Sequence, residues 1–300
     1  MAKRVLLFVL TNLAVLVMVS IVLAILGQLG ILRLGAGQGV LLVWCTIWGF
    51  GAAFVSLLLS RWTAKRALGV QLIGPDTPDA GAQQLYATVS HLVQAAHLPM
   101  PEVGIYDSPE LNAFATGPSK SRSLVAVSTG LLRSMERAEI EGVLGHEVTH
   151  IANGDMMTMT LIQGVVNAFV LYLAHLVAYA VRAFVSGRDE EGRSPGFLGY
   201  LAGQLAFIAA QIAFGLLGSM ITAWFSRHRE FRADAGGATL AGRGNMVAAL
   251  QRLRQNENLV DTRNAPQLAT FKISGRSQLM LLLATHPPLE QRIAALEGRT

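Results

Sequence analysis

The chain has 300 residues, of which 52% are hydrophobic and only 14% are charged. Soluble domains carry about 25% charged residues, so this composition excludes an ordinary soluble protein and favours one that crosses a lipid bilayer. The net charge of +5 is small, and we expect no nucleic-acid partner. The single cysteine, Cys45, excludes an intrachain disulfide.

Four apolar stretches reach the length of about 20 residues that a membrane-spanning helix needs. They cover residues 5–26, 39–59, 156–181 and 197–225. The first stretch follows two basic residues, as the apolar core of a cleaved signal peptide does. It is longer than that core, however, and no small-residue cleavage site follows it. We therefore expect a retained anchor and four transmembrane helices.

Basic residues beside these stretches predict the orientation. They precede the first stretch and follow the second and the fourth: Lys3, Arg4, Arg61, Lys65, Arg66, Arg227, Arg229 and Arg232. Positive charge in short loops marks the cytoplasmic side of a membrane, so we expect both termini to face the cytoplasm. The same residues favour contact with anionic lipid headgroups.

Residues 67–155 form the first block outside the predicted spans. Residues 83–97 carry apolar side chains at helical spacing, which predicts a helix. Residues 102–107 and 123–129 are short, alternating and rich in β-branched side chains, so we predict two strands there. Residues 118–122 are rich in Pro and Ser and predict a turn before the second strand.

The end of this block, His146-Glu147-Val148-Thr149-His150, matches the H-E-x-x-H pattern. On a helix, residues four apart share a face, so His146 and His150 can direct two imidazoles at one metal ion. Glu147 points elsewhere but can reach a water on that metal, which is the position of a general base. A chance match is the alternative, but Ser134 as an N-cap and the acidic residues after it favour the required helix.

A catalytic zinc needs a third protein ligand and an open position for water. We predict Glu230 as this ligand, and Asp234, four residues later, as the partner that holds a ligating imidazole by its second ring nitrogen. Two antiparallel spans between His150 and Glu230 would return the chain to the same membrane surface. His228 is the rival ligand, since His is a common zinc partner. An ion pair with neighbouring arginines is the other interpretation of Glu230.

The second block, residues 226–300, carries two predicted helices. Residues 245–254 have an apolar face, and residues 289–297 follow two prolines that suit the first turn of a helix. Residues 256–278 are polar and irregular, and the sequence predicts no element there.

Several separated segments resemble, in order, the HtpX-type integral-membrane metalloproteases, which are related to the CAAX prenyl proteases. Besides the two N-terminal apolar stretches, they are residues 112–117 (Asn-Ala-Phe-Ala-Thr-Gly), 146–155, 229–234 and 285–288 (Thr-His-Pro-Pro). The resemblance covers nearly the whole chain. Thr149 stands where Ser is common in such proteins, which affects neither the ligands nor the base.

This resemblance implies a mainly α-helical membrane protein, with four transmembrane helices and a cytoplasmic α+β zincin-like (gluzincin) protease domain that contains a small sheet. It implies a zinc endopeptidase of the bacterial inner membrane that degrades misfolded or damaged membrane proteins as part of quality control and the stress response. His146, His150 and Glu230 would hold one Zn²⁺ per chain, and Glu147 would be the base. The chain would divide into a transmembrane hairpin (1–66), a first protease part (67–155), a second hairpin (156–225) and a second protease part (226–300).

Three further residues are candidates for contact with the substrate or the transition state. Asn112 could bind the backbone of a peptide that lies along an edge strand near residues 111–117, or it could cap its own turn. His286 could donate to an oxyanion, or it could simply precede the closing helix. Arg292 could serve the same purpose as His286. His175, inside the third apolar stretch, is a functional candidate as an intramembrane ionisable group, although a hydrogen bond to a neighbouring helix is the simpler account.

Other functions stay open at this stage. A non-catalytic membrane chaperone or scaffold with a structural zinc would need four ligands, usually including Cys, and Cys45 lies inside a span. An intramembrane protease would place the metal motif within the bilayer, but the acidic residues before His146 argue against that. A CAAX-type prenyl protease would need a larger membrane chamber. The oligomeric state and the individual substrates are not predicted.

Overall fold

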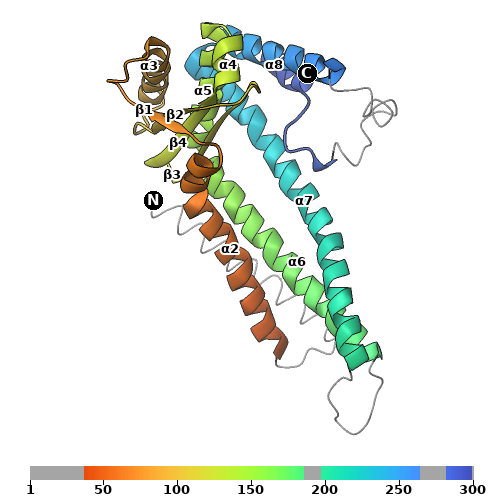
Figure 1. Ribbon diagram of the computed structural model, residues 1–300. Helices are drawn as coiled ribbons and strands as arrows, with labels where there is room; N and C mark the ends of the chain where they lie inside the picture. Colours follow the sequence, from red (N-terminus) through yellow and green to blue (C-terminus); the bar gives the residue numbers. More distant parts are fainter. Residues whose placement is uncertain (1–36, 186–196, 264–281, 299–300) are drawn as a thin grey trace. The chain divides into compact units, whose positions relative to one another are not determined.

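The computed structural model describes residues 37–185, 197–263 and 282–298 (Figure 1). The chain divides into two compact units, residues 1–55 with 160–222, and residues 56–159 with 223–300. The first predicted span, residues 5–26, lies outside the described residues.

Three described helices are long and apolar enough to cross a membrane. They are α2 (Gly37–Ala67), α6 (Asp155–Val185) and α7 (Phe197–Ala241). They contain the second, third and fourth predicted spans, and α7 continues well beyond residue 225, where we expected the span to end. Large apolar side chains are exposed along them, including Trp48 at 65% and Ile212 at 62%, as expected of helix faces that contact lipid.

Small residues let the helices of the first unit approach closely. A Cβ atom on Gly49 of α2 would lie 2.5 Å from the backbone nitrogen of Ala168 on α6. Close approach through small residues is the usual packing of membrane helices. His175 donates a hydrogen bond to the carbonyl of Leu171 at 2.8 Å, and its ring packs edge-on against Phe207. The expected hydrogen bond to a neighbouring helix was therefore wrong, because the partner lies one turn earlier on α6 itself.

The second unit contains a four-stranded sheet in the order β1-β2-β4-β3. Its strands are β1 (Gln71–Ile73), β2 (Glu102–Tyr106), β3 (Ala113–Ser119) and β4 (Arg122–Ser128). β2 and β4 are parallel, and the other two pairs are antiparallel. The two predicted strands are confirmed as β2 and β4. The predicted turn at 118–122 is shorter than expected, because β3 continues to Ser119 and β4 begins at Arg122.

Further helices of this unit are α3 (Ala80–Ala95), α4 (Thr129–Ser134), α5 (Arg137–Asn153), α8 (Arg243–Arg263) and α11 (Leu289–Glu297). In this unit, α3, α4 and α5 contact the sheet, α8 packs on α5, and α11 packs on α8. Leu92 of α3, Val125 of β4, Leu144 of α5 and Ala249 of α8 share one buried core. The sequence predicted α3, α5, α8 and α11, with shifted ends for α3 and α8.

The predicted N-cap of α5, Ser134, was wrong. Ser134 ends the short helix α4, which is capped by Ser128, and α5 begins only at Arg137. The carboxylate of Glu139 accepts a hydrogen bond from the backbone N–H of Glu136 at 2.8 Å and so satisfies an amide at the start of α5. This local bond, rather than a serine hydroxyl, fixes the beginning of the helix that carries the metal motif.

Candidate metal centre

Helix α5 places His146 and His150 one turn apart, and both side chains are buried. The two rings meet edge-on, with centroids 4.6 Å apart. Gly154 then ends the helix with φ +69, a left-handed conformation that glycine adopts without strain. The chain turns there into α6, whose first residue is Asp155.

Glycines on α5 and α7 let these two helices approach closely. A Cβ atom on Gly237 of α7 would lie 2.9 Å from the backbone nitrogen of His146, and one on Gly145 of α5 would lie 2.9 Å from the Cβ of Ala241. Any larger side chain at these positions would push the helices apart. The same approach brings Glu230, two turns before Gly237 on α7, to the histidines.

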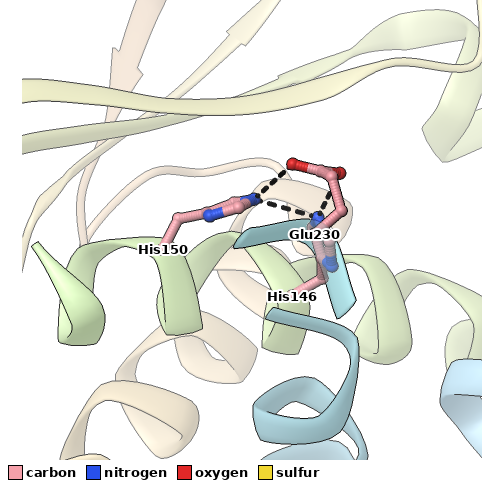
Figure 2. Close-up of side chains that lie close together, drawn as sticks. All are labelled: His146, His150 and Glu230. Carbon is pink, nitrogen blue, oxygen red and sulfur yellow. Dashed lines mark hydrogen bonds and ion pairs between the residues drawn. The ribbon is translucent and has the colours of Figure 1, made fainter. Parts of the chain in front are cut away.

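Three ligand atoms converge from these helices, as Figure 2 shows. The Nε2 atoms of His146 and His150 are 3.1 Å apart. They lie 3.5 Å and 3.4 Å, respectively, from the two carboxylate oxygens of Glu230. Two ligands about 2.0–2.1 Å from one zinc ion at a tetrahedral angle are about 3.4 Å apart. The spacing of the three groups therefore fits one tetrahedral metal ion.

The remaining ring nitrogens are held by carboxylates. His146 Nδ1 lies 2.9 Å from Asp234 Oδ1, and His150 Nδ1 lies 2.7 Å from Asp155 Oδ2. Each carboxylate favours the proton on Nδ1, so the neutral rings direct their Nε2 lone pairs toward each other and toward Glu230. Lone pairs that converge in this way repel one another unless a cation lies among them. The donor set thus fits a metal ion.

Glu230 supplies a further test of this fit. Its side chain is completely buried, and its Oε1 atom accepts no hydrogen bond from any residue that the structure describes. A buried carboxylate oxygen without a hydrogen bond is costly. Coordination to a cation between the two imidazoles would satisfy it.

When no metal is bound, the neighbouring carboxylates favour the protonated, positively charged forms of His146 and His150. Burial lowers the pKa of His150, but the hydrogen bond to Asp155 and the negative charge of Glu230 outweigh it and raise the pKa from 6.5 to about 9. Burial likewise lowers the pKa of His146, and the carboxylates of Asp234 and Glu230 raise it above its usual value. Without a metal, the two imidazoles therefore tend to hold protons. These protons occupy the position that the spacing of the ligands fits to a metal ion.

Two residues of the C-terminal segment reach this centre. His286 Nδ1 lies 2.8 Å from Glu230 Oε2, and the rest of its side chain is largely exposed. Arg292 of α11 is buried and binds Asp234 with two hydrogen bonds, of 2.8 Å and 2.6 Å. Burial lowers the pKa of Arg292, but the hydrogen bond to Asp234 raises it above its usual value, so the guanidinium stays charged.

A cavity of about 530 Å³ opens beside the ligands. Glu147 and Asn112 both line it, together with His146, Glu230 and His286. Glu147 is half-buried, and Asn112 is exposed and directly precedes β3. β3 is an edge strand of the described sheet. The cavity therefore joins the metal ligands to an open strand edge.

Asp155, the partner of His150, was not predicted from the sequence. Asp155 belongs to the motif segment 146–155, but no function was predicted for it. Its spacing did not indicate that the helix ends at Gly154 and that the next residue lies beside His150. The signal was available: a C-capping glycine directly followed by an acidic residue. His228, the rival ligand, lies apart from the ligand group. It donates from Nδ1 to the carbonyl of Trp224, and its ring lies tilted against the ring of that residue.

Comparison with known proteins decides the family. The family model described as "Peptidase family M48" matches residues 79–300. The chain belongs to peptidase family M48. The M48 chain is 51% identical to Protease HtpX of Shewanella oneidensis over 298 residues, which are 99% of this chain and 100% of that protein. It is also 51% identical to Protease HtpX of Shewanella loihica over 299 residues, again 99% of this chain and 100% of the relative.

Among solved structures, the M48 chain is similar to Ste24p of S. mikatae, with a TM-score of 0.60 and 19% identity. The match covers 85% of this chain and spans only 58% of the length of Ste24p, and it shows a shared fold. Family membership, the candidate spans and the cluster of His146, His150 and Glu230 together identify a membrane metalloprotease.

Proposed function

We propose that this chain is a zinc-dependent endopeptidase that hydrolyses misfolded or damaged membrane proteins on the cytoplasmic side of a bacterial inner membrane. The observation that carries the proposal is the convergence of His146, His150 and Glu230 beside a cavity that Glu147 also lines. Zinc is the metal that two imidazoles and one carboxylate at tetrahedral spacing favour. The similarity to proteins named Protease HtpX over the full chain supports the peptidase activity.

In the proposed mechanism, zinc when bound supplies Lewis acidity to the attacking water and to the scissile carbonyl. Glu147 accepts the proton of that water and returns it to the leaving amine. His286, beside Glu230 at the rim of the cavity, donates a hydrogen bond to the developing oxyanion. Asp155 and Asp234 keep the two ligating imidazoles in the tautomer with the proton on Nδ1.

We further propose that the substrate adds to the sheet as an extended strand along β3. β3 is the edge strand that borders the cavity, and Ala113, its first residue, lines that cavity together with Asn112. Asn112 would then fix the peptide backbone. Arg292 is buried, and its Nε and Nη2 atoms donate to Asp234. These bonds favour a supporting role for this arginine over direct contact with the oxyanion.

The unit with residues 56–159 and 223–300 would be the protease domain, and the spans of the other unit would hold it at the membrane. A bilayer and unfolded stretches of membrane proteins would be its partners. Basic residues at the C-terminal end of α2 and after residue 225 support cytoplasmic exposure of the site.

The competing proposal, a scaffold with a structural zinc, requires a fourth protein ligand. The described residues offer a group of three, with a cavity on the open side, so this observation favours catalysis.

The test uses the full-length protein in detergent with an unfolded protein as substrate. The metal-free enzyme should gain activity on addition of zinc, and Glu147→Gln should lose about 10²–10⁴-fold in rate while still binding one zinc ion. Glu110→Gln, an exposed carboxylate outside the cavity, is the matched control and should keep full activity. Tight zinc binding by the wild type without any cleavage would favour the scaffold.

A further inference from the structure

Arg227 of α7 joins the metal-bearing helix to the segment that carries His286. Its Nη1 atom donates hydrogen bonds to the carbonyls of Leu282 at 3.1 Å and Ala284 at 2.7 Å. Arg227 lies three residues before Glu230, so the two side chains project from neighbouring positions on one helix. The same helix thus presents Glu230 to the metal site and a guanidinium to the backbone beside it.

The segment from Leu282 to Pro288 depends on contacts with other elements to fix its conformation. Residues 284–288 have no regular secondary structure, and the His286 side chain is 63% exposed. Pro287 and Pro288 have no N–H group to donate. Among the described residues, Arg227 and the single bond from His286 to Glu230 provide the hydrogen bonds that tie residues 282–287 to another element. The His286 side chain is therefore held in place by only this one hydrogen bond of its own among the described residues.

We infer that Arg227 is a positioning residue that holds His286 at the metal centre. The two carbonyls that it binds lie four and two residues before His286, so they set the path of the chain directly into that side chain. A displacement of about 1 Å at a reacting centre can cost 10²-fold in rate, which is why a contact one turn from the chemistry matters. The inference rests on the proposed role of His286 in the endopeptidase reaction.

This role differs from a general contribution to folding. The candidate ligand group is His146, His150 and Glu230, and Arg227 is not part of it, so its loss should leave zinc binding intact. Its effect on turnover should also pass entirely through His286. A double-mutant cycle isolates such dependence, because residues that act through one another give non-additive losses.

The experiment compares Arg227→Ala, His286→Ala and the double variant of the full-length enzyme in detergent, with zinc content and helix content measured for each. We expect Arg227→Ala to lower kcat on the order of tenfold to a hundredfold, with a smaller change in KM. The double variant should match His286→Ala alone. Arg227→Lys, whose ammonium can also donate to both carbonyls, should recover part of the loss. Arg232→Ala, an exposed arginine on the same helix, is the matched control.

Limited proteolysis gives a readout that is independent of activity. In Arg227→Ala, the segment of residues 282–288 should be cleaved faster by an added protease, while α5 should be cleaved no faster than in the wild type. Unchanged cleavage of this segment would overturn the inference, and so would losses that multiply in the double variant. If His286→Ala keeps the wild-type kcat, the positioning role fails while the endopeptidase proposal still stands on Glu147→Gln. Failure of Glu147→Gln to lose activity would instead contradict the endopeptidase proposal itself.

Discussion

Arg292 and Asp234 form a bidentate ion pair, in which the Nε and Nη2 atoms of the arginine lie 2.8 Å and 2.6 Å from the two carboxylate oxygens. One of these oxygens, Oδ1, also lies 2.9 Å from His146 Nδ1. A single carboxylate therefore connects the closing helix α11 to a candidate metal ligand of α5.

The first prediction concerns the pair itself. Removing one partner of a buried ion pair leaves the other charge uncompensated, which costs about 3–5 kcal/mol. Arg292→Ala should therefore lower the free energy of unfolding by an amount of this order, measured by denaturant titration of the metal-free protein. Arg243→Ala, at the exposed start of α8, should have little effect. Equal stability of the two variants would contradict a supporting role for Arg292.

The second prediction concerns Asp155. Its carboxylate holds His150 Nδ1 at 2.7 Å, and partners of this kind raise metal affinity about 10–100-fold. Asp155→Asn keeps an oxygen that can accept the same hydrogen bond but removes the charge, so zinc affinity should fall within this range. Competition with a fluorescent chelator measures it. Asp76→Asn, an exposed acid of the same unit, should bind zinc as the wild type does.

The third prediction concerns pH. The pKa of His150 rises from 6.5 to about 9 in the metal-free folded protein. A raised histidine pKa adds stability that is fully present below 6.5 and is lost as the pH rises through about 9. Thermal unfolding of the metal-free protein should therefore show falling stability across this window. His91→Gln should keep this dependence, and His150→Gln should weaken it.

The same proton opposes metal binding. Between pH 6.5 and about 9 a metal ion must displace it from the imidazole, so binding should release protons and the apparent affinity should rise with pH. Calorimetric titration with zinc in two buffers of different ionisation enthalpy measures the release. An apparent affinity that is independent of pH in this window would rule out the protonated metal-free site.

The fourth prediction concerns the close approach of α5 and α7. Gly237→Ala adds a Cβ atom 2.9 Å from the backbone of His146, so the helices must separate or rotate and the Glu230 carboxylate must move away from the imidazoles. We expect a loss of both stability and zinc affinity, since overpacking costs about 1–3 kcal/mol. Gly244→Ala, which meets no atom within 4 Å, is the control.

Much of this site follows from periodicity. The spacing of His146, Glu147 and His150 fixes their relative directions once α5 forms, and the apolar pattern of residues 83–97 and 289–297 is sufficient to predict α3 and α11. Glu230 and Asp234 were placed by their spacing and by an even number of intervening spans. The spacings are local rules about one helix, and only the placement of Glu230 beside the histidines also used the number of spans between them.

Other features depend on contacts between distant elements, and the sequence alone did not reveal them. β1 has only three residues, Gln71–Ile73, and exists because its backbone pairs with β2. β3 contains Gly117 at φ +139 and a register shift, so its sequence lacks the alternation of a regular strand. The bond between Arg227 and the carbonyl of Ala284 joins positions 57 residues apart, and no side-chain pattern marks a backbone carbonyl as a partner.

The order of the site residues along the chain also matters during synthesis on the ribosome. His146 and His150 emerge first, but they are only two ligands, and the third, Glu230, emerges only after both α6 and most of α7. His286 and Arg292 emerge later still. A nascent chain whose first hundred and fifty or so residues are already inserted has no complete metal site. Under the proposed function, the protease would therefore become competent only when almost all of it has been translated, and this order would protect both the growing chain and the neighbouring membrane proteins during insertion.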